Sequence, residues 1–375
     1  MRIAIIDADL IGRKKHRFPN LACMKLSGYY KELGDKVELK IDYENLDQYD
    51  KVFISKVFTD TPIEEDILNL QNVEYGGTGF FFDKAPNLPE EIEHHMPDYH
   101  LYDEWIEKQI ENGVKKSEFK EYTDYSIGFL TRGCFRKCPF CVNQKYNKVE
   151  SHSPLEEFYD SSRKKICLLD DNFFGCPDWK TMLTELKNTN KPFKFKQGMD
   201  ERILTKDKCE LLFSCKYDSD PYFAFDNIAD YELIKNKLEL IRQTTDKQCV
   251  FYVLCGFDYN DKYDEEFWDQ DIIDVFKRIE LLMQYKCLPY IMRFNKYEES
   301  PYRGMYINIA RWCNQPSFYK KKSFLEFCNM ECHINGATHR YLEEFMQHSK
   351  PKNYEHYFNM KFSDYNAKYQ IQKTN

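Results

Sequence analysis

The sequence predicts an α/β protein built on parallel sheets. Two observations support this prediction. Short apolar runs alternate with segments of helical periodicity along most of the chain, and most of the later runs end in polar side chains. Alternation of this kind is typical of parallel strands joined by helices. With 375 residues, the chain has room for more than one domain with a sizeable core.

The first 112 residues predict a small α/β layer. Residues 21–33 have helical spacing and end at Gly34, which is a natural helix stop. Apolar or alternating runs predict its strands at residues 3–6, 37–41, 52–55 and 73–75. The last of these runs leads into the turn Gly76-Gly77-Thr78-Gly79. We therefore expect a Rossmann-like parallel sheet over residues 1–112, with residues 98–112 as a connecting arm.

From residue 126 the alternation restarts and stays regular. Strand-like runs begin near residues 126, 165, 193, 221, 249 and 288, and each is followed by a helical segment. Ser153 and Glu156 form the pattern of a capping box for the first of these helices. The later helices are expected at 178–186, 206–213, 231–242 and 265–283. Six β/α units are too few for a closed barrel of eight, but they suit a partial one. We assign residues 113–299 to this barrel and 300–375 to a C-terminal extension with a helix near 304–312.

Composition narrows the class of protein. The formal net charge is −8, which argues against non-specific binding to nucleic acid. Neither an apolar run of about 18 residues nor a signal-peptide pattern occurs, so we expect a cytoplasmic protein without a membrane partner. In that compartment the 14 cysteines are expected as reduced thiols, some of them ligands.

The most informative stretch is a Cys-x3-Cys-x2-Cys motif formed by Cys134, Cys138 and Cys141. A cubane iron–sulfur cluster normally takes four cysteine thiolates, so three thiolates on one loop leave one iron open. The alternative is a zinc knuckle, which requires a fourth Cys or His close by; the next candidate, His152, is too distant. With Phe140 as the aromatic residue before the third cysteine, the motif resembles the signature of the radical S-adenosylmethionine (SAM) superfamily.

This resemblance implies a fold, cofactors and a reaction. The fold is a partial (β/α)6 barrel, and the cofactors are a [4Fe–4S] cluster on the three cysteines and SAM. The implied reaction is reductive cleavage of SAM to methionine and a 5′-deoxyadenosyl radical, which abstracts hydrogen from a substrate that the sequence does not identify. An oxygen-sensitive enzyme supplied by an electron donor such as flavodoxin or ferredoxin is expected.

Polar side chains follow five consecutive strands of the predicted barrel, at the edge where parallel β/α barrels carry their active sites. Asp170, Asp171 and Asn172 match the position of the superfamily motif that meets the SAM ammonium group. The other candidate cofactor contacts are Phe140 and Gly256 for adenine, and Gln197, Asp200, Arg202 and Asp226 for the ribose, the carboxylate or the substrate. Asp and Asn at such turns also cap helices, which is the alternative interpretation.

The N-terminal layer resembles the cobalamin-binding domain fused to one branch of the superfamily. The cobalt-binding pattern Asp-x-His-x-x-Gly is absent, and its nearest match, Asp98-Tyr99-His100, is followed by Asp103 where glycine is required. We therefore expect a degenerate layer that does not bind cobalamin.

Two alternative functions stay open: a cobalamin-dependent radical SAM methyltransferase, and a non-catalytic iron–sulfur binding protein. In the C-terminal extension, Cys313, Cys328 and Cys332 are expected to be buried thiols. An auxiliary metal site on these three cysteines is the open alternative.

Overall fold

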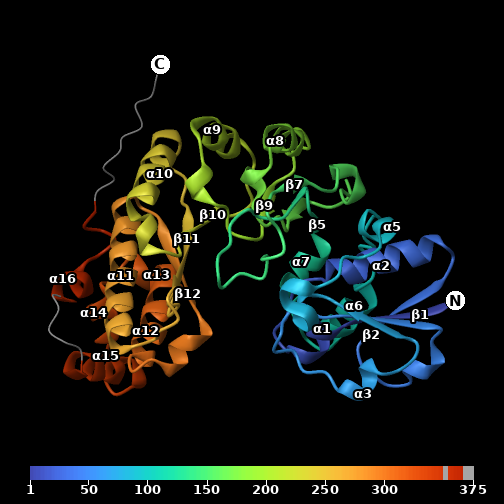
Figure 1. Ribbon diagram of the computed structural model, residues 1–375, viewed down its shortest axis with the longest axis horizontal. Coiled ribbons are helices and arrows are strands. Elements are labelled where there is room, and N and C mark those ends of the chain that lie inside the picture. The colour runs from blue at the N-terminus through green and yellow to red at the C-terminus, as the bar shows by residue number, and fades with distance from the viewer. Residues whose placement is uncertain (349–353, 366–375) are drawn as a thin grey trace. The chain divides into compact units, whose positions relative to one another are not determined.

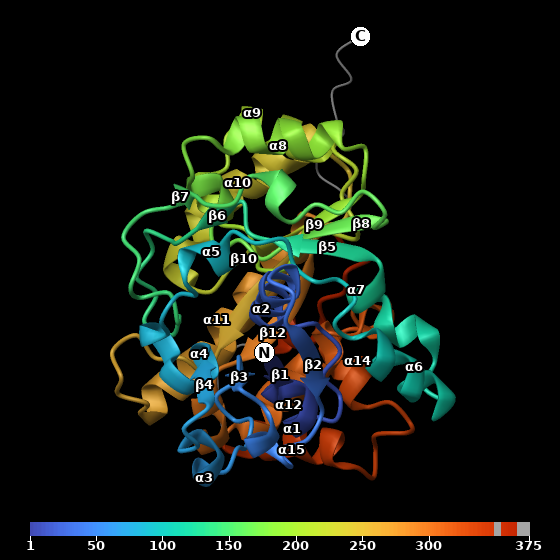
Figure 2. The same ribbon diagram turned by 90° about the vertical axis from the view of Figure 1, so that its right-hand side faces the viewer.

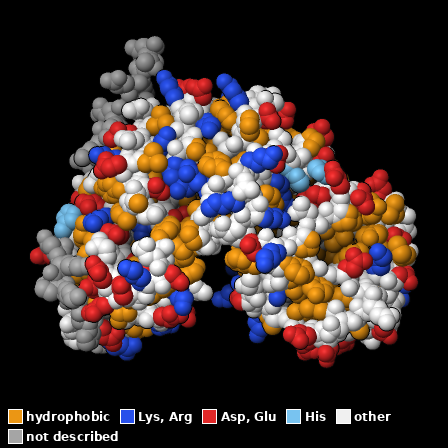
Figure 3. Space-filling view, viewed as in Figure 1, with side chains coloured by type: hydrophobic (Ala, Val, Ile, Leu, Met, Phe, Trp, Pro, Cys, Tyr) orange, Lys and Arg blue, Asp and Glu red, His pale blue; other side chains and the backbone are white. Residues whose placement is uncertain are grey.

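The computed structural model describes residues 1–348 and 354–365 (Figure 1). The chain forms two compact units, residues 1–196 and 197–375. The domain boundaries after residues 112 and 299 stay predictions. On the face drawn in Figure 3, acidic and basic side chains are interspersed, in keeping with 54 Lys and Arg against 62 Asp and Glu. Within the described residues, no helix combines the length and apolarity needed to cross a membrane.

The first unit begins with a four-stranded parallel sheet in the order β2-β1-β3-β4. Its strands are β1 (Arg2–Asp7), β2 (Lys36–Lys40), β3 (Lys51–Ser55) and β4 (Val73–Gly76). Helix α2 (Leu21–Glu32), capped by Asn20, lies on one side of this sheet and α3 (Glu65–Leu68) on the other (Figures 1 and 2). Each side therefore has its own apolar core. The shorter helices are α1 (Ala8–Gly12), α4 (Thr78–Phe81) and α5 (Glu90–Glu93).

The prediction of a connecting arm at residues 98–112 was wrong. This segment contains α6 (Asp103–Glu111) and packs into the core of the N-terminal sheet. Tyr99, Tyr102 and Ile106 are buried there, and the Tyr102 hydroxyl donates to Asp7 Oδ2 at 2.9 Å. The physical reason is apolar burial, because the aromatic side chains of this segment complete the core over α2 and β1.

The first unit also contains a three-stranded parallel sheet in the order β5-β8-β9. It follows α7 (Lys120–Thr123), and its strands are β5 (Tyr125–Gly128), β8 (Lys165–Leu168) and β9 (Phe193–Phe195). Helix α8 (Trp179–Asn188) connects β8 to β9. These three strands lie where the sequence predicts them.

The helix predicted after the capping pattern at Ser153 and Glu156 does not form. Only a 3-10 turn (Leu155–Glu157) occurs, and no side chain caps it. Two other contacts hold this segment in place. The Tyr99 hydroxyl donates to the Phe158 carbonyl at 2.6 Å, and Asp160 N–H donates to Oγ of Ser126 in β5 at 3.0 Å. These contacts take backbone groups that a helix would have used.

The second unit contains another three-stranded parallel sheet, in the order β10-β11-β12. Its strands are β10 (Tyr222–Ala224), β11 (Val250–Cys255) and β12 (Leu288–Arg293), and its predicted helices form as α9 (Lys206–Ser214), α10 (Tyr231–Thr244) and α11 (Glu265–Gln284). The predicted helix of the extension is α12 (Arg303–Cys313). It is followed by α13 (Pro316–Tyr319), α14 (Phe324–Cys328), α15 (Ala337–His348) and α16 (Tyr354–Asn359).

A buried arginine donates hydrogen bonds at the carboxyl ends of both β10 and β11. Arg278 is 2% exposed, and its Nη1 donates to the carbonyls of Phe225, Asp226 and Leu254 at 3.0, 2.9 and 2.8 Å. Its Nε donates to the Asp274 carbonyl at 3.1 Å. The position of Asp226 therefore depends on this guanidinium.

We predict that Arg278→Met lowers the free energy of unfolding by at least about 3 kcal/mol, because it leaves buried carbonyls without donors. Urea denaturation followed by circular dichroism measures this. Lys277→Met is the matched control, because the Lys277 side chain on the same helix is 41% exposed and its ion pair with Asp274 is a surface pair. Equal stabilities for the two variants would contradict the role of Arg278.

Candidate functional site

The three cysteines lie on a loop, residues 133–149, whose ends run side by side. Strands β6 (Thr131–Arg132) and β7 (Glu150–Ser151) are antiparallel and close the loop. Gly133 has φ of +93°, and a Cβ there would be 2.4 Å from the Lys148 carbonyl oxygen. Only glycine fits both this backbone conformation and this close approach.

The surroundings of the sulfur atoms suit thiolate ligands. All three cysteines are half-buried. Arg136 N–H donates to Cys134 Sγ at 3.3 Å, and Asn143 N–H donates to Cys141 Sγ at 3.4 Å. Hydrogen bonds of this kind stabilise cluster-ligating thiolates and tune the cluster potential.

The donor set therefore fits an iron–sulfur cluster in its chemistry, with three thiols and N–H donors on one loop. Within the described residues, no three His, Cys, Asp or Glu side chains already converge in a metal-binding arrangement. The assignment of Cys134, Cys138 and Cys141 as ligands therefore stays a prediction. Phe140 lies on the same loop and is half-buried.

The side chains of Lys137 and Gln144 donate hydrogen bonds to backbone carbonyls within the loop. Lys137 Nζ donates to the carbonyls of Gln144, at 2.6 Å, and of Tyr146. Gln144 Nε2 donates in turn to the carbonyls of Cys138 and, at 3.2 Å, of Cys141. These contacts fold residues 144–146 back on the cysteine-bearing segment.

The side chains that follow β8 hold the ends of this loop. The buried carboxylate of Asp170 accepts from Thr131 N–H and Oγ1, both at 2.7 Å, and from Leu130 N–H at 3.3 Å. Asp171 accepts from Gly133 N–H at 3.0 Å and from Asn143 Nδ2 at 2.7 Å.

Asn172 continues the same pattern. It is 2% exposed, and its Nδ2 donates to Cys134 Sγ at 3.3 Å. Residues 170–172 thus contact both the start of the loop and its middle. The structure gives these residues a positioning role that the sequence did not predict, and their predicted contact with the SAM ammonium group stays a prediction.

Burial raises the pKa of Asp170 to about 7, against the opposing effect of its hydrogen bonds from Thr131 and Leu130. The charged form is therefore disfavoured in the folded protein. The stability that this group contributes is fully present below its ordinary pKa of 3.8 and is lost as the pH rises through about 7.

We predict that Asp170→Ala destabilises the chain by at least about 2 kcal/mol, because Thr131 and Leu130 lose their buried acceptor. The iron content after anaerobic reconstitution should fall as well, and Asp170→Asn, which keeps an acceptor oxygen, should lose less of both. Urea denaturation and iron analysis measure the two effects. Glu185→Ala, at an exposed position on α8, is the control. Wild-type stability and iron content in Asp170→Ala would show that the carboxylate does not hold the loop.

A carboxylate from the N-terminal layer contacts both ends of the cysteine loop. Glu93, at the end of α5, has its side chain 13% exposed. Its Oε1 lies 3.5 Å from Arg132 Nη2 at the start of the loop and 3.0 Å from His152 Nε2 just beyond its end. Lys25 Nζ of α2 is 3.1 Å from the same oxygen.

Burial works against ionisation of Glu93, but His152, Lys25 and Arg132 outweigh it and lower its pKa to about 2. Glu93 is therefore charged at neutral pH. It contributes stability at a pH above its ordinary pKa of 4.5, and this stability is lost as the pH falls towards 2.

We predict that Glu93→Gln lowers the free energy of unfolding by at least about 2 kcal/mol at pH 7. The difference from wild type should shrink as the pH falls from about 5 to about 3. Urea denaturation across this range measures it, with Glu91→Gln, at an exposed position on the same helix, as the control. A difference that does not depend on pH would rule out the charge network as its cause.

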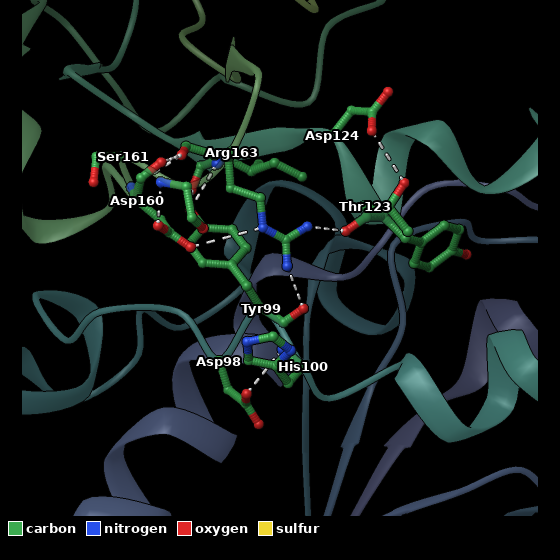
Figure 4. Close-up of polar contacts among 12 residues, drawn as sticks. Asp98, Tyr99, His100, Thr123, Asp124, Asp160, Ser161 and Arg163 are labelled. Carbon is green, nitrogen blue, oxygen red and sulfur yellow. Dashed lines mark hydrogen bonds and ion pairs between the residues drawn. The ribbon is translucent and has the colours of Figure 1, made fainter.

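A separate open hollow of about 400 Å³ lies in the first unit and is lined by residues 96–100 and 159–161 (Figure 4). Arg163, two residues after the last lining residue, donates to the carbonyls of Tyr122 and Tyr99, both at 2.6 Å. Asp98 accepts from Ser27 Oγ at 2.6 Å and from Lys31 Nζ at 2.7 Å. The charged groups of this hollow serve internal contacts and supply no recognisable reaction chemistry.

The remaining predicted cofactor contacts belong to the second unit. Gln197 is exposed. Arg202 Nε donates to Asp200 Oδ1 at 2.7 Å, and its Nη1 donates to Asp230 Oδ2 at 3.1 Å. The structure therefore brings Asp200 and Arg202 together and adds Asp230, which sequence reasoning missed.

Asp226 and Gly256 follow neighbouring strands of the same sheet. Burial raises the pKa of Asp226 to about 6, although Arg278 and Arg202 oppose this. Gly256 has φ of +73°, and its N–H donates to Asp271 Oδ2 at 2.7 Å. The cofactor roles of all five residues stay predictions.

Glu201 is a further residue that sequence reasoning missed. It is 1% exposed, its Oε2 accepts from Ala224 N–H at 2.9 Å, and burial raises its pKa to about 8. No signal in the sequence separated it from its neighbours Asp200 and Arg202.

The polar groups at the carboxyl edge of the N-terminal sheet contact one another. Asp9 accepts from Val57 N–H at 2.7 Å and from Thr61 Oγ1, and Asp7 accepts from Tyr102. A Cβ at Gly77 would be 2.2 Å from the Lys56 carbonyl oxygen, so the glycine turn packs against the end of β3. Polar groups at this edge are thus engaged in internal hydrogen bonds.

The three cysteines of the extension have different surroundings. Cys313 and Cys328 are buried, whereas Cys332 is exposed. The expectation of buried thiols is therefore confirmed for the first two and wrong for Cys332. An auxiliary metal site on these cysteines stays an untested alternative.

No protein-family model matches the chain. No curated protein matches it either.

The chain shows remote similarity to some solved structures. The radical S-adenosylmethionine methyltransferase TsrM from Kitasatospora setae, with cobalamin and a [4Fe–4S] cluster bound, is 12% identical over 78% of this chain and 72% of that chain, with a TM-score of 0.49. The cobalamin-dependent S-adenosylmethionine radical enzyme OxsB with aqua-cobalamin bound is 14% identical, with a TM-score of 0.36. Its apo form is 15% identical, with a TM-score of 0.37.

The alignments with OxsB cover 89% and 92% of this chain but 56% and 61% of the OxsB chains. By their descriptions these three structures are radical SAM enzymes.

Proposed function

We propose that this protein is a radical SAM enzyme that binds a [4Fe–4S] cluster through Cys134, Cys138 and Cys141. One observation supports the proposal above all. The Cys-x3-Cys-x2-Cys motif lies on a loop whose sulfur atoms receive N–H donors and whose position is fixed by the side chains that follow β8. The proposal includes the sequence-based assignment of residues 113–299 to a partial (β/α)6 barrel.

When bound, such a cluster supplies the electron that splits SAM into methionine and a 5′-deoxyadenosyl radical. The protein's own part is to hold and orient the groups involved. Asp170, Asp171 and Asn172 fix the loop, and the N–H groups of Arg136 and Asn143 stabilise thiolates at Cys134 and Cys141. The reaction on the substrate is hydrogen abstraction.

The SAM contacts proposed from the sequence are Phe140, Gln197, Asp200, Arg202, Asp226 and Gly256, together with residues 170–172. Because residues 170–172 also hold the cysteine loop, a loss of SAM affinity in their variants has to be compared with the iron content. Variants of Arg202 give a cleaner test, because Arg202 donates to Asp200 and Asp230, which lie outside the loop.

The two alternative functions differ in their cofactor behaviour. A methyltransferase of the cobalamin-dependent class would bind a corrinoid, whereas a non-catalytic iron–sulfur protein would not cleave SAM. The contacts of Asp7, Asp9 and Gly77 at the edge of the N-terminal sheet support a layer without cobalamin. Protein produced with cobalamin supplied should therefore carry no corrinoid.

We predict that the anaerobically reconstituted chain binds about four irons in one cluster and, with dithionite and SAM, releases 5′-deoxyadenosine and methionine. Replacing Cys134, Cys138 and Cys141 together by Ala should abolish both, because no ligand set remains on the loop. Iron analysis, electron paramagnetic resonance and chromatography of the products measure this. Cys332→Ser, at an exposed cysteine outside the loop, is the control.

Retention of the cluster in the triple variant would overturn the ligand assignment. A reducible cluster that binds SAM without cleaving it would favour the non-catalytic protein. Tight stoichiometric corrinoid binding would favour the methyltransferase.

A further inference from the structure

Two buried cysteines of the second unit lie next to each other at the start of neighbouring strands. Cys249 directly precedes β11 and Cys287 directly precedes β12. Val250 pairs with Leu288 in the parallel register, and Leu288 N–H donates to the Cys249 carbonyl at 2.9 Å. Neighbouring strands are about 4.8 Å apart, which lies within the Cα separation of about 4.4–6.8 Å that a disulfide requires.

A buried arginine contacts one of these thiols. Arg242, in the last turn of α10, is 6% exposed, and its Nη2 donates to Cys287 Sγ at 3.2 Å. Its other donors bond to backbone carbonyls: Nε to Tyr285 at 2.7 Å, and Nη1 to Thr245 and Lys247 at 3.1 and 2.8 Å. The guanidinium is therefore fixed in place by the backbone around the cysteine pair.

The charge of Arg242 favours a thiolate beside it. The pKa of Arg242 is raised, because the neighbouring Cys287, Cys249 and Asp246 outweigh the opposing effect of burial. A buried cation is costly unless an anion compensates it. The sulfur of Cys287 is the ionisable group that accepts its hydrogen bond.

The pKa values of the two thiols are shifted in opposite directions. Burial opposes ionisation of Cys287, but hydrogen bonds from Cys249 and Arg242 and the charge of Arg242 outweigh it, so that the pKa of Cys287 is lowered. The hydrogen bond with Cys287, followed by burial, raises the pKa of Cys249 well above its ordinary value. The sulfur atoms of Cys249 and Cys287 donate to the carbonyls of Lys247 and Tyr285, at 3.6 Å each, and Cys287 Sγ also accepts from Arg242. Cys287 is therefore the member of the pair that the cation favours as a thiolate.

We propose that Cys249 and Cys287 form a reversible redox modification site, in which Arg242 holds Cys287 as the reactive thiolate. With hydrogen peroxide as the oxidant, the Cys287 thiolate attacks one peroxide oxygen and becomes a sulfenic acid, and hydroxide leaves. The Cys249 thiol then attacks the Cys287 sulfur, the disulfide bond forms, and the sulfenic oxygen leaves as water. The two cysteines lose two electrons in total, and one peroxide is reduced.

Other buried cysteines of this unit provide an internal comparison. Cys313 is 2% exposed, and burial followed by the charge of Cys255 raises its pKa well above the ordinary value. Burial likewise raises the pKa of Cys209 to about 11. Both are expected to be inert thiols, because the thiolate is the reactive form. Cys249 and Cys287 are buried to the same degree, so burial alone does not explain a difference in reactivity.

The test uses the purified full chain before iron is added, treated with hydrogen peroxide under native conditions. Alkylation and peptide mass spectrometry then follow each cysteine separately. We expect a disulfide between Cys249 and Cys287 that dithiothreitol reverses, formed at least about ten-fold faster than Cys313 or Cys209 is oxidised. Cys249→Ser should stop the reaction at a sulfenic acid on Cys287, which dimedone traps.

Arg242→Met should slow the oxidation of Cys287 to the rate of Cys313. Should this variant fail to fold, Cys249→Ser with dimedone still decides the question in a chain that keeps Arg242. The proposal is overturned if Cys287 reacts no faster than Cys313, if the disulfide forms only after unfolding in urea, or if Cys249→Ser yields no dimedone adduct on Cys287.

Discussion

Three consecutive side chains after β8 determine where the cysteine loop lies. The Asp170 carboxylate accepts hydrogen bonds from residues just before the loop. Asp171 accepts from Gly133, the first residue of the loop, and from Asn143 in its middle. Asn172 donates to Cys134 Sγ. Because these side chains project from the end of a sheet strand, the loop takes its position from a rigid element. Leaving a buried donor such as Thr131 N–H without its acceptor costs about 1–3 kcal/mol.

The N-terminal layer supplies the second constraint on the loop. Glu93 contacts Arg132 at the loop's start and His152 just beyond its end, and Lys25 joins the same carboxylate. The N-terminal layer thus contributes to the position of the loop. The layer and the loop belong to the same compact unit, and the charge network is one of the contacts between them.

The sequence predicted the strands of the three parallel sheets, because their apolar runs and polar ends are local patterns. It did not predict that Asp170 and Asp171 hold the loop, because their partners Thr131 and Gly133 lie about forty positions earlier in the chain. Glu93 was missed because it ends a run of glutamates that reads as a solvated surface. The capping-box pattern at Ser153 predicted a helix that does not form, because tertiary contacts of Phe158 and Asp160 overrode the local preference.

We expect a loop held in this way to leave one iron of the proposed cluster open to SAM. Electron–nuclear double resonance of the reduced cluster, with SAM isotopically labelled at its amino nitrogen, tests this claim most directly. We expect a hyperfine coupling between the labelled nitrogen and the cluster, together with a change in the electron paramagnetic resonance signal when SAM is added. An unchanged signal and no coupling, in protein that carries a complete reduced cluster, would contradict it.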